Sequence, residues 1–301
     1  MIDHELTVGG RENASSVFSR GRYTVGAEIM AYSTDAIRRA TEQCDSLAAL
    51  VVMNGIGEGT GSGHFASVSD TVADDFAKKT KLNFVVTPSQ ALGGSILEPY
   101  NAVCGFNAQL TSYHLNVQVE NEAIAGLLKS RVRVESPGFR EINRLIAQLV
   151  SSVTLPARNG HDISNLGPNM VPFPRLHFAV PSLGPLIPAE QKDHESLALP
   201  SLITEVFSNT NQWVPTCFRS RICLPIAASL HLRGALSHVA RGLDTHSMLP
   251  NAVHFSPKSI TVTRSFQPPS IVGDLLAPTH SSASLLLNTT GFYHTWQRIA
   301  K

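Results

Sequence analysis

The sequence predicts an α/β protein, in which a mainly parallel sheet is followed by one long helix and then by a segment of α+β type. Three observations predict this fold class. Helical and strand-like segments alternate through the first half of the chain, a glycine-rich string at 54–63 joins a strand-like run to a helical one, and residues 138–154 carry helical periodicity. Alternation of this kind favours parallel strands connected by helices, because each crossover packs a helix on the sheet.

The first half of the chain divides into elements by its apolar pattern and its turn residues. The expected elements are a helix near 23–44, a strand at 47–53, a helix at 64–79, a strand at 82–87, a helix near 97–108 and a strand at 114–119. Loops that follow the carboxyl ends of parallel strands lie at one edge of the sheet, where such folds bind ligands. The loops at 54–63 and 88–98 are therefore expected to share a site.

A strongly amphipathic helix is expected at 138–154, after Pro137-Gly138. Its apolar residues recur at helical spacing over several turns, at Ile142, Leu145, Ile146, Leu149, Val150 and Val153. This spacing predicts a central packing helix. Beyond Pro156 the chain has turn-rich connectors and short β-branched runs such as 260–263, and the candidate helices there are 199–208, 235–243 and 283–299.

The string at 54–63 reads Asn-Gly-Ile-Gly-Glu-Gly-Thr-Gly-Ser-Gly and precedes a helical stretch that begins near His64. Small residues let backbone amides approach an anion closely, and a helix N-terminus adds free amide donors. The loop is therefore expected to cradle phosphate, with a tight turn as the structural alternative. Three enzyme templates fail, because the loop lacks a Gly-Lys-Ser/Thr ending, Thr60 breaks the nucleophile-elbow pattern, and Ser62 replaces a glycine of the dinucleotide fingerprint.

Composition limits the classes of partner. The 301 residues carry a net charge of +1 and no long basic block, so no electrostatic footprint for nucleic acid is expected. The apolar runs are too short to span a membrane. The four cysteines have no zinc-type spacing and the histidines form no HxxxH arrangement, so no metal site held by protein side chains is expected. The first residues do not resemble a leader, so a reduced cytoplasmic setting is expected.

Further strings lie along the chain in one order. They are 20–26 (Arg-Gly-Arg-Tyr-Thr-Val-Gly), 98–101 (Glu-Pro-Tyr-Asn), 121–124 (Asn-Glu-Ala-Ile), 143–154 in the core helix, and 169–178 (Asn-Met-Val-Pro-Phe-Pro-Arg-Leu-His-Phe). With the glycine string, they resemble the tubulin family, whose phosphate loop is matched at 57–63 except for Glu58 in place of a glycine. The resemblance runs from about Leu6 to the C-terminus and mixes alpha-like and beta-like segments.

The resemblance implies an incomplete Rossmann-like GTP-binding domain at 1–137, a core helix at 138–154, an α+β intermediate domain at 155–291, and the start of a C-terminal helix at 292–301. It also implies a set of nucleotide-binding residues: Gly57, Gly59, Thr60, Gly61, Ser62 and Gly63 for the phosphates, Glu98 for the ribose hydroxyls, Asn121 and Asn143 for the guanine edge, and Phe139 for stacking on the base. Amides both donate and accept, and a π-face suits any base. The structural alternatives are helix caps, a first-turn acid and ordinary packing.

Several positions depart from the family pattern. The segment 9–16 keeps Gly10 and Glu12, but Ser16 replaces an asparagine. Asn165 stands at the position of a hydrolysis-promoting glutamate, and an amide cannot act as a general base. Asp193-His194 stands where the family has an aromatic or histidine pair in the lateral-contact loop, so that an acid replaces the aromatic residue. The family's first strand and first phosphate loops precede the matched region, so an uncovered apolar edge is expected in the sheet.

The resemblance implies a GTP-binding structural subunit of microtubules or a related cytoskeletal polymer. Its cofactor would be GTP, with Mg²⁺ held through the nucleotide, and its partners other tubulin subunits; at most it would be a weak, polymer-dependent GTPase. One alternative is a truncated tubulin paralogue that binds no nucleotide and acts through protein contacts. Another is a dinucleotide-dependent enzyme that uses the glycine loop, although no acid, base or nucleophile is grouped near it.

Overall fold

The computed structural model describes residues 4–88, 94–158, 163–191, 198–215, 223–235, 260–269, 273 and 275–299. The expected helix at 235–243, the pair Asp193-His194 and the residues 89–93 of one candidate loop lie outside these ranges, except for residue 235. The chain divides into two compact units, Met1–Asn116 with Arg298–Lys301, and Val117–Gln297.

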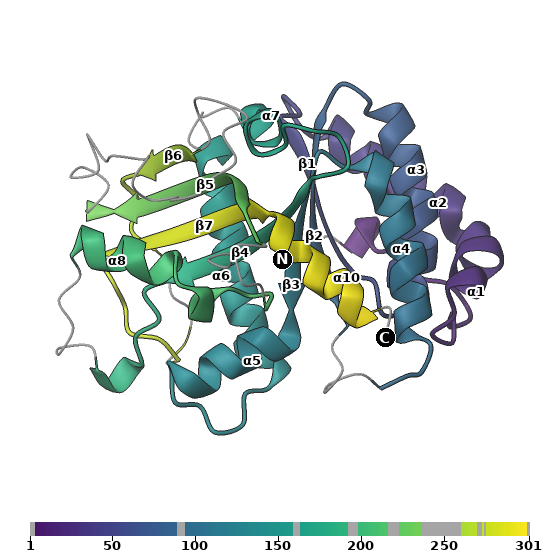
Figure 1. Cartoon of the computed structure of the whole chain (residues 1–301). Helices are drawn as coiled ribbons and strands as arrows, with labels where there is room; N and C mark the ends of the chain where they lie inside the picture. Colours follow the sequence, from purple (N-terminus) through teal and green to yellow (C-terminus); the bar gives the residue numbers. More distant parts are fainter. Residues whose placement is uncertain are drawn as a thin grey trace. The chain divides into compact units, whose positions relative to one another are not determined.

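The first unit contains two strands and the helices that cover them. Its elements are η1 (His4–Leu6), α1 (Phe18–Tyr23), α2 (Val25–Glu42), β1 (Ala49–Gly55), η2 (Thr60–His64), α3 (Phe65–Asp75), β2 (Thr80–Thr87) and α4 (Glu98–Ser112). Helices α2, α3 and α4 lie side by side (Figure 1). Their apolar faces are buried with the end of β1 through residues such as Ile56, Ala66, Val72, Ala102 and Phe106.

Strands β1 and β2 are parallel, in a register that runs from Ala49 beside Thr80 to Gly55 beside Val86. β1 is an edge strand: no other strand of the described residues pairs with its second side. Two of its side chains on one face remain exposed, Val51 at 39 % and Met53 at 54 %. Among the described residues, this edge of β1 is unpaired and has no charged side chain, so it is open to pairing with another chain.

The second unit begins within β3 (Leu115–Glu120). Its further elements are α5 (Asn121–Ser130), α6 (Phe139–Arg158), η3 (Ile163–Asn165), α7 (Leu166–Met170), β4 (Phe178–Gly184), η4 (Ala189–Gln191), α8 (Leu199–Val206), η5 (Asn209–Asn211), β5 (Pro225–Gly234), β6 (Ile260–Ser265), β7 (Ser281–Thr289), η7 (Thr290–Phe292) and α10 (Tyr293–Ile299). Strand β7 pairs antiparallel with both β4 and β5, and β6 pairs parallel with β5.

Helices cover both faces of these strands. On one face α8 packs on alternate residues of β5 and β7 in a buried apolar cluster of Leu199, Leu202, Ile203, Val206, Ala228, Leu230, Leu232, Ala283, Leu285 and Leu287. α6 contacts all four strands. Its Ser152 hydroxyl lies 2.7 Å from that of Ser284, which projects from the opposite face of β7 to Leu285. The sheet of this unit is therefore enclosed between α8 and α6.

The core helix is confirmed as α6, and its predicted apolar positions Ile142, Leu145, Ile146, Leu149 and Val153 are buried. The helix continues to Arg158 through Pro156, beyond the predicted end at 154. The predicted helix at 283–299 is wrong in its first half, which is strand β7, and only Tyr293–Ile299 is α-helical. Every residue of β7 is buried, so the strand lacks the one-sided alternation of apolar and polar residues that separates a strand from a helix in the sequence.

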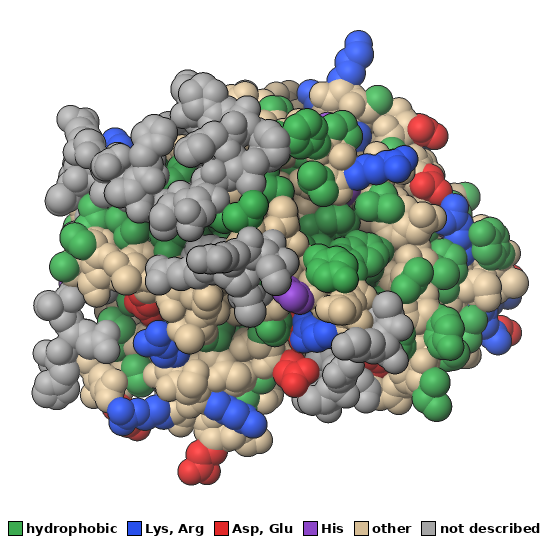
Figure 2. All heavy atoms as spheres, in the orientation of Figure 1, with side chains coloured by type: hydrophobic (Ala, Val, Ile, Leu, Met, Phe, Trp, Pro, Cys, Tyr) green, Lys and Arg blue, Asp and Glu red, His purple; other side chains and the backbone are tan. Residues whose placement is uncertain are grey.

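Charged side chains do not separate by sign on the surface that Figure 2 shows, where Lys and Arg alternate with Asp and Glu. In the part of the chain that the structure describes, no helix is long and apolar enough to cross a membrane.

Candidate functional site

The glycine loop, defined here as residues 55–63, leaves the carboxyl end of β1 and closes in the short π-helical turn η2. Its carbonyl groups are held by the protein. The Asn54 Nδ2 donates to the carbonyl oxygen of Gly61 at 3.0 Å, and the Ser62 amide donates to that of Glu58 at 3.0 Å. Irregular helical turns of this kind are frequent at functional sites.

Three glycines of the loop pack backbone to backbone against neighbouring elements. A β-carbon on Gly59 would lie 2.6 Å from the amide nitrogen of Val17, and one on Gly63 would overlap the carbonyl oxygen of Phe18 at the start of α1. A β-carbon on Gly61 would overlap the carbonyl of Gly55. Close packing alone therefore explains why these positions are glycine, and the tight-turn alternative gains support.

The polar residues of the glycine loop differ in their solvent exposure. Thr60 is exposed, as is the side chain of Glu58, so the Glu58 carboxylate is solvated rather than buried among the loop amides. Ser62 is 1 % exposed, and its hydroxyl donates to the Glu58 carbonyl oxygen. In this conformation Ser62 supports the loop, whereas the Thr60 hydroxyl is accessible.

Glu98 lies beside the glycine loop at the first residue of α4. Its Oε1 accepts hydrogen bonds from the amides of Gly94, at 2.8 Å, and Ser95, at 3.2 Å. Its Oε2 is 3.7 Å from the position of a β-carbon on Gly57. One carboxylate oxygen is therefore anchored by backbone amides while the other borders the loop, as expected if the loops at 54–63 and 88–98 share a site.

Asn101 makes contacts that sequence reasoning did not identify. It is buried in α4, three residues after Glu98, and its amide joins the glycine loop to the segment before α1. The only signal in the sequence is its place in the string at 98–101. The partners are distant along the chain, so neither periodicity nor spacing reveals them.

The segment 8–14 and the glycine loop both line a cavity of about 210 Å³. Gly10 and Glu12 contribute to its lining, as do Thr60 and His64. Glu12 also forms an ion pair with Arg20 at 2.6 Å. The structure thus brings together the two expected phosphate-side segments, 9–16 and 57–63.

His64 also lines this cavity. Its Nε2 lies 3.0 Å from the hydroxyl of Ser33 on α2. Burial lowers the pKa of His64, and a backbone contact with Gly26 opposes that effect in part. The imidazole is therefore expected to be largely neutral at about pH 7.

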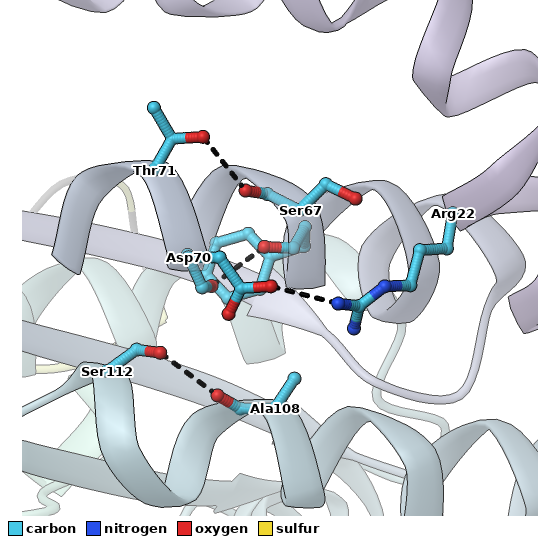
Figure 3. A network of polar contacts seen from close by, with 8 residues as sticks. Arg22, Ser67, Asp70, Thr71, Ala108 and Ser112 are labelled. Carbon is cyan, nitrogen blue, oxygen red and sulfur yellow. Dashed lines mark hydrogen bonds and ion pairs between the residues drawn. The ribbon is translucent and has the colours of Figure 1, made fainter. Parts of the chain in front are cut away.

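Helix α3, which continues directly from the glycine loop, is fixed by two polar contacts. Arg22 of α1 forms an ion pair with Asp70 at 2.9 Å (Figure 3). The Ser69 hydroxyl lies 3.0 Å from the hydroxyl of Tyr113, whose ring stacks on Phe65. Burial raises the pKa of Tyr113 to about 12. These contacts hold the helix whose N-terminus ends the loop.

The residues expected to read guanine belong to the second unit. Asn121 is the first residue of α5, and Phe139 and Asn143 lie in the first two turns of α6, which contacts α5. Phe139 is 67 % exposed and Asn143 is exposed. Neither asparagine side chain makes a hydrogen bond with a described residue. Phe139 and Asn143 are thus exposed at the start of α6, and Asn121 is half-buried at the start of α5.

A larger cavity of about 560 Å³ lies within the second unit, between α6, α7, β5 and β6. Asn165 lines it together with Asn169, His231 and Arg264. His231 is fully buried, its Nε2 lies 3.1 Å from the Ser229 hydroxyl, and its Nδ1 has no hydrogen-bond partner among the described residues. Burial lowers the pKa of His231 to about 4.

The comparison with sequence families agrees with this architecture. A family described as "Tubulin/FtsZ family, GTPase domain" matches residues 2–129, and one described as "Tubulin C-terminal domain" matches residues 174–301. The first match contains the glycine loop and Glu98, and the second contains β4 to α10. The two matches together define a tubulin-type α/β protein.

Similar proteins cover nearly the whole chain. The tubulin alpha-2 chain of Emericella nidulans is 33 % identical in an alignment of 310 positions that covers 98 % of this chain and 67 % of that protein. The tubulin alpha chain of Dictyostelium purpureum is 33 % identical over 96 % of this chain and 91 % of its own length, and the tubulin alpha chain-like 3 of Mus musculus is 31 % identical over 98 % and 68 %. The chain belongs to the tubulin family. It spans about two thirds of the length of most of these relatives.

Proposed function

We propose that this protein is a guanine-nucleotide-binding structural subunit of a tubulin-type cytoskeletal polymer. The observation that carries the proposal is the grouping around the glycine loop: the exposed Thr60 hydroxyl, the Glu98 carboxylate and the Gly10–Glu12 segment all border it. A carboxylate suits ribose hydroxyls, and glycine amides at the start of a helix suit phosphate. Partners in this proposal are other tubulin subunits, and its location is the microtubule cytoskeleton.

The roles follow from the chemistry of each group. Amides of Gly57, Gly59, Gly61 and Gly63 and the Thr60 hydroxyl would hold the phosphates, while Ser62 would keep the loop closed. Glu98 would accept from the ribose. Asn121 and Asn143 would read the base, on which Phe139 would stack. The accessible amides and the exposed ring support this assignment of the second-unit trio.

These residues fit GTP, which would bring its Mg²⁺ through its phosphates. No catalytic step is assigned to the protein. Asn165, at the position of the family's hydrolysis-promoting glutamate, lines the larger cavity of the second unit. An amide there supports a subunit that does not promote hydrolysis in a neighbour.

A second candidate is association with tubulins without nucleotide. It is favoured by the unpaired edge of β1 with the exposed Val51 and Met53, and by the close packing that already accounts for three loop glycines. Apolar side chains on an unpaired edge provide a surface for another chain.

The variants Glu98→Ala and Asn143→Ala distinguish the two candidates when a fluorescent GTP analogue is titrated against the chain. Each removes hydrogen bonds to the nucleotide, so each is expected to weaken binding by about tenfold. Glu122→Ala, an exposed neighbour of Asn121, is the control and should bind as the wild type does. If all variants bound the analogue with equal affinity, or if ATP displaced the analogue as readily as GTP does, the specific nucleotide site would be rejected. The candidate that associates with tubulins without nucleotide would then remain.

A further inference from the structure

Asn101 is buried at 3 % exposure and uses its whole side-chain amide on backbone groups. Its Oδ1 accepts from the amide of Phe18 at 2.9 Å. Its Nδ2 donates to the carbonyl oxygens of Ser16, at 2.8 Å, and Gly57, at 2.9 Å. One side chain on α4 therefore joins the glycine loop to the end of the 9–16 segment.

The segment that Asn101 holds is strained. Ser15 and Ser16 have φ angles of 51° and 55°, so two consecutive residues with β-carbons occupy the left-handed region. Such residues persist only where their surroundings fix them. The Asn13 Oδ1 accepts from the amide of Ser15 at 3.1 Å, and Asn101 holds the Ser16 carbonyl and the Phe18 amide beyond it. The turn is thus fixed by an asparagine on each side.

The bond to Gly57 also orients the glycine loop. Because a trans peptide is planar, its carbonyl and N–H point in opposite directions. Drawing the Gly57 carbonyl toward Asn101 directs the amide of Glu58 away from α4. Two further loop carbonyls are held by side chains, that of Gly61 by Asn54 and that of Glu58 by Ser62. Three carbonyl oxygens of the loop that would repel an anion are therefore engaged by the protein.

We infer that Asn101 is a positioning residue that joins the 9–16 segment and the glycine loop into one cradle for a polyphosphate chain. The inference rests on the proposed nucleotide function. In it, Asn101 supports the site without contacting the nucleotide itself. Asn101 acts through the two segments, so its loss changes phosphate affinity more than affinity for the nucleoside.

Two variants and one matched control test this role. Asn101→Ala removes all three hydrogen bonds. Asn101→Asp keeps the size and the acceptor for the Phe18 amide but loses the donors to Ser16 and Gly57. Asn107→Ala, an exposed asparagine of the same helix, is the control. Affinities for GTP, guanosine and inorganic tripolyphosphate are measured on the intact chain, together with hydrogen exchange.

Both Asn101 variants are expected to weaken binding of GTP and of tripolyphosphate by roughly tenfold or more, and to leave guanosine binding within about twofold of wild type. The amides of residues 15–18 are expected to exchange faster in Asn101→Ala, while those of α3 keep their protection. Asn107→Ala is expected to match wild type in every measurement.

An unchanged ratio of GTP to guanosine affinity in both Asn101 variants would overturn the positioning role while the proposed function stands. Faster exchange throughout α3, with GTP and guanosine weakened equally, would reduce Asn101 to a general stabilising residue and also overturn it. Wild-type chain that binds neither GTP nor tripolyphosphate would remove the proposed function, and the role of Asn101 with it.

Discussion

Gly21 of α1 lies directly against the carbonyl group of Gly59, so closely that a β-carbon on Gly21 would overlap the carbonyl oxygen. The contact places a helix backbone on the backbone of the glycine loop. Gly63 makes the reciprocal approach to Phe18. The backbones of α1 and the glycine loop are therefore in direct contact, and neither segment has room for a side chain at this point.

Gly21→Ala is expected to destabilise the protein, because the added methyl must push α1 away from the loop. The overpacking costs about 1–3 kcal/mol, and the better helix propensity of alanine offsets only part of it. Urea unfolding measures the difference. Gly126→Ala in α5 is the matched control, since nothing lies within 4 Å of its β-carbon position, and it should stabilise by up to about 1 kcal/mol. Equal stabilities of the two variants would contradict the close packing.

His231 is expected to make the protein less stable in acid. Its pKa is about 4 in the folded protein and 6.5 for the unperturbed group, so between these values the unfolded chain binds more protons and stability falls as the pH falls. The loss approaches about 3 kcal/mol at the lower end. Unfolding free energies across this pH range should show a slope that His231→Leu reduces by about one proton. If the unfolding free energies of the wild type and His231→Leu had the same slope against pH, His231 would not have a lowered pKa in the folded protein.

Tyr113 is expected to weaken the fold in strong base. Burial raises its pKa to about 12, against about 10 for the unperturbed phenol, so the folded protein keeps a proton that the unfolded chain releases, and stability falls as the pH rises between these values. Ultraviolet difference titration should detect one tyrosine that ionises at about pH 12, and Tyr113→Phe should remove that transition. Tyr32→Phe, at an exposed site, should leave it in place. Persistence of the transition in Tyr113→Phe would assign it to another residue.

Asn288 is expected to be a strong stabilising residue of the second unit. Its Nδ2 donates to the carbonyl oxygens of Met170, at 2.8 Å, and Leu176, at 2.7 Å, from a site that is 2 % exposed. Asn288→Ala leaves the buried carbonyl of Met170 and the part-buried carbonyl of Leu176 without this donor, which costs about 2–4 kcal/mol. Asn209→Ala, at an exposed position of η5, is the comparison. The melting temperatures of the two variants are compared by thermal unfolding. Equal melting temperatures would contradict this role.

Helix α6 was predictable from the sequence because its burial is one-sided, which gives the helical spacing from Ile142 to Val153. The parallel pair β1 and β2 was predictable from the alternation of helical and strand-like segments. β7 was mistaken for a helix because it is buried on both faces, which removes the alternation that marks a strand. α1 was missed, since its residues carry a glycine and charged side chains in place of an apolar stripe.

The candidate site was less predictable, because its geometry depends on contacts between distant segments. The glycine string indicated a loop, but the approach of α1 that requires Gly59 and Gly63 has no local signature. Asn101 bonds to residues more than forty positions away. The buried hydroxyl of Ser62 is likewise a consequence of how η2 closes, whereas the sequence shows only its residue type.

Equilibrium dialysis of unlabelled GTP against the purified chain, with ATP and then GDP as competitors, tests the central claim most directly. In the proposed function, Thr60, Glu98 and Gly10 border the phosphate loop and Asn121 and Asn143 would read guanine. This proposal predicts saturable binding of one GTP per chain that GDP displaces and ATP does not. Absence of saturable binding, or equal displacement by ATP, would contradict the assignment of this site to guanine nucleotide.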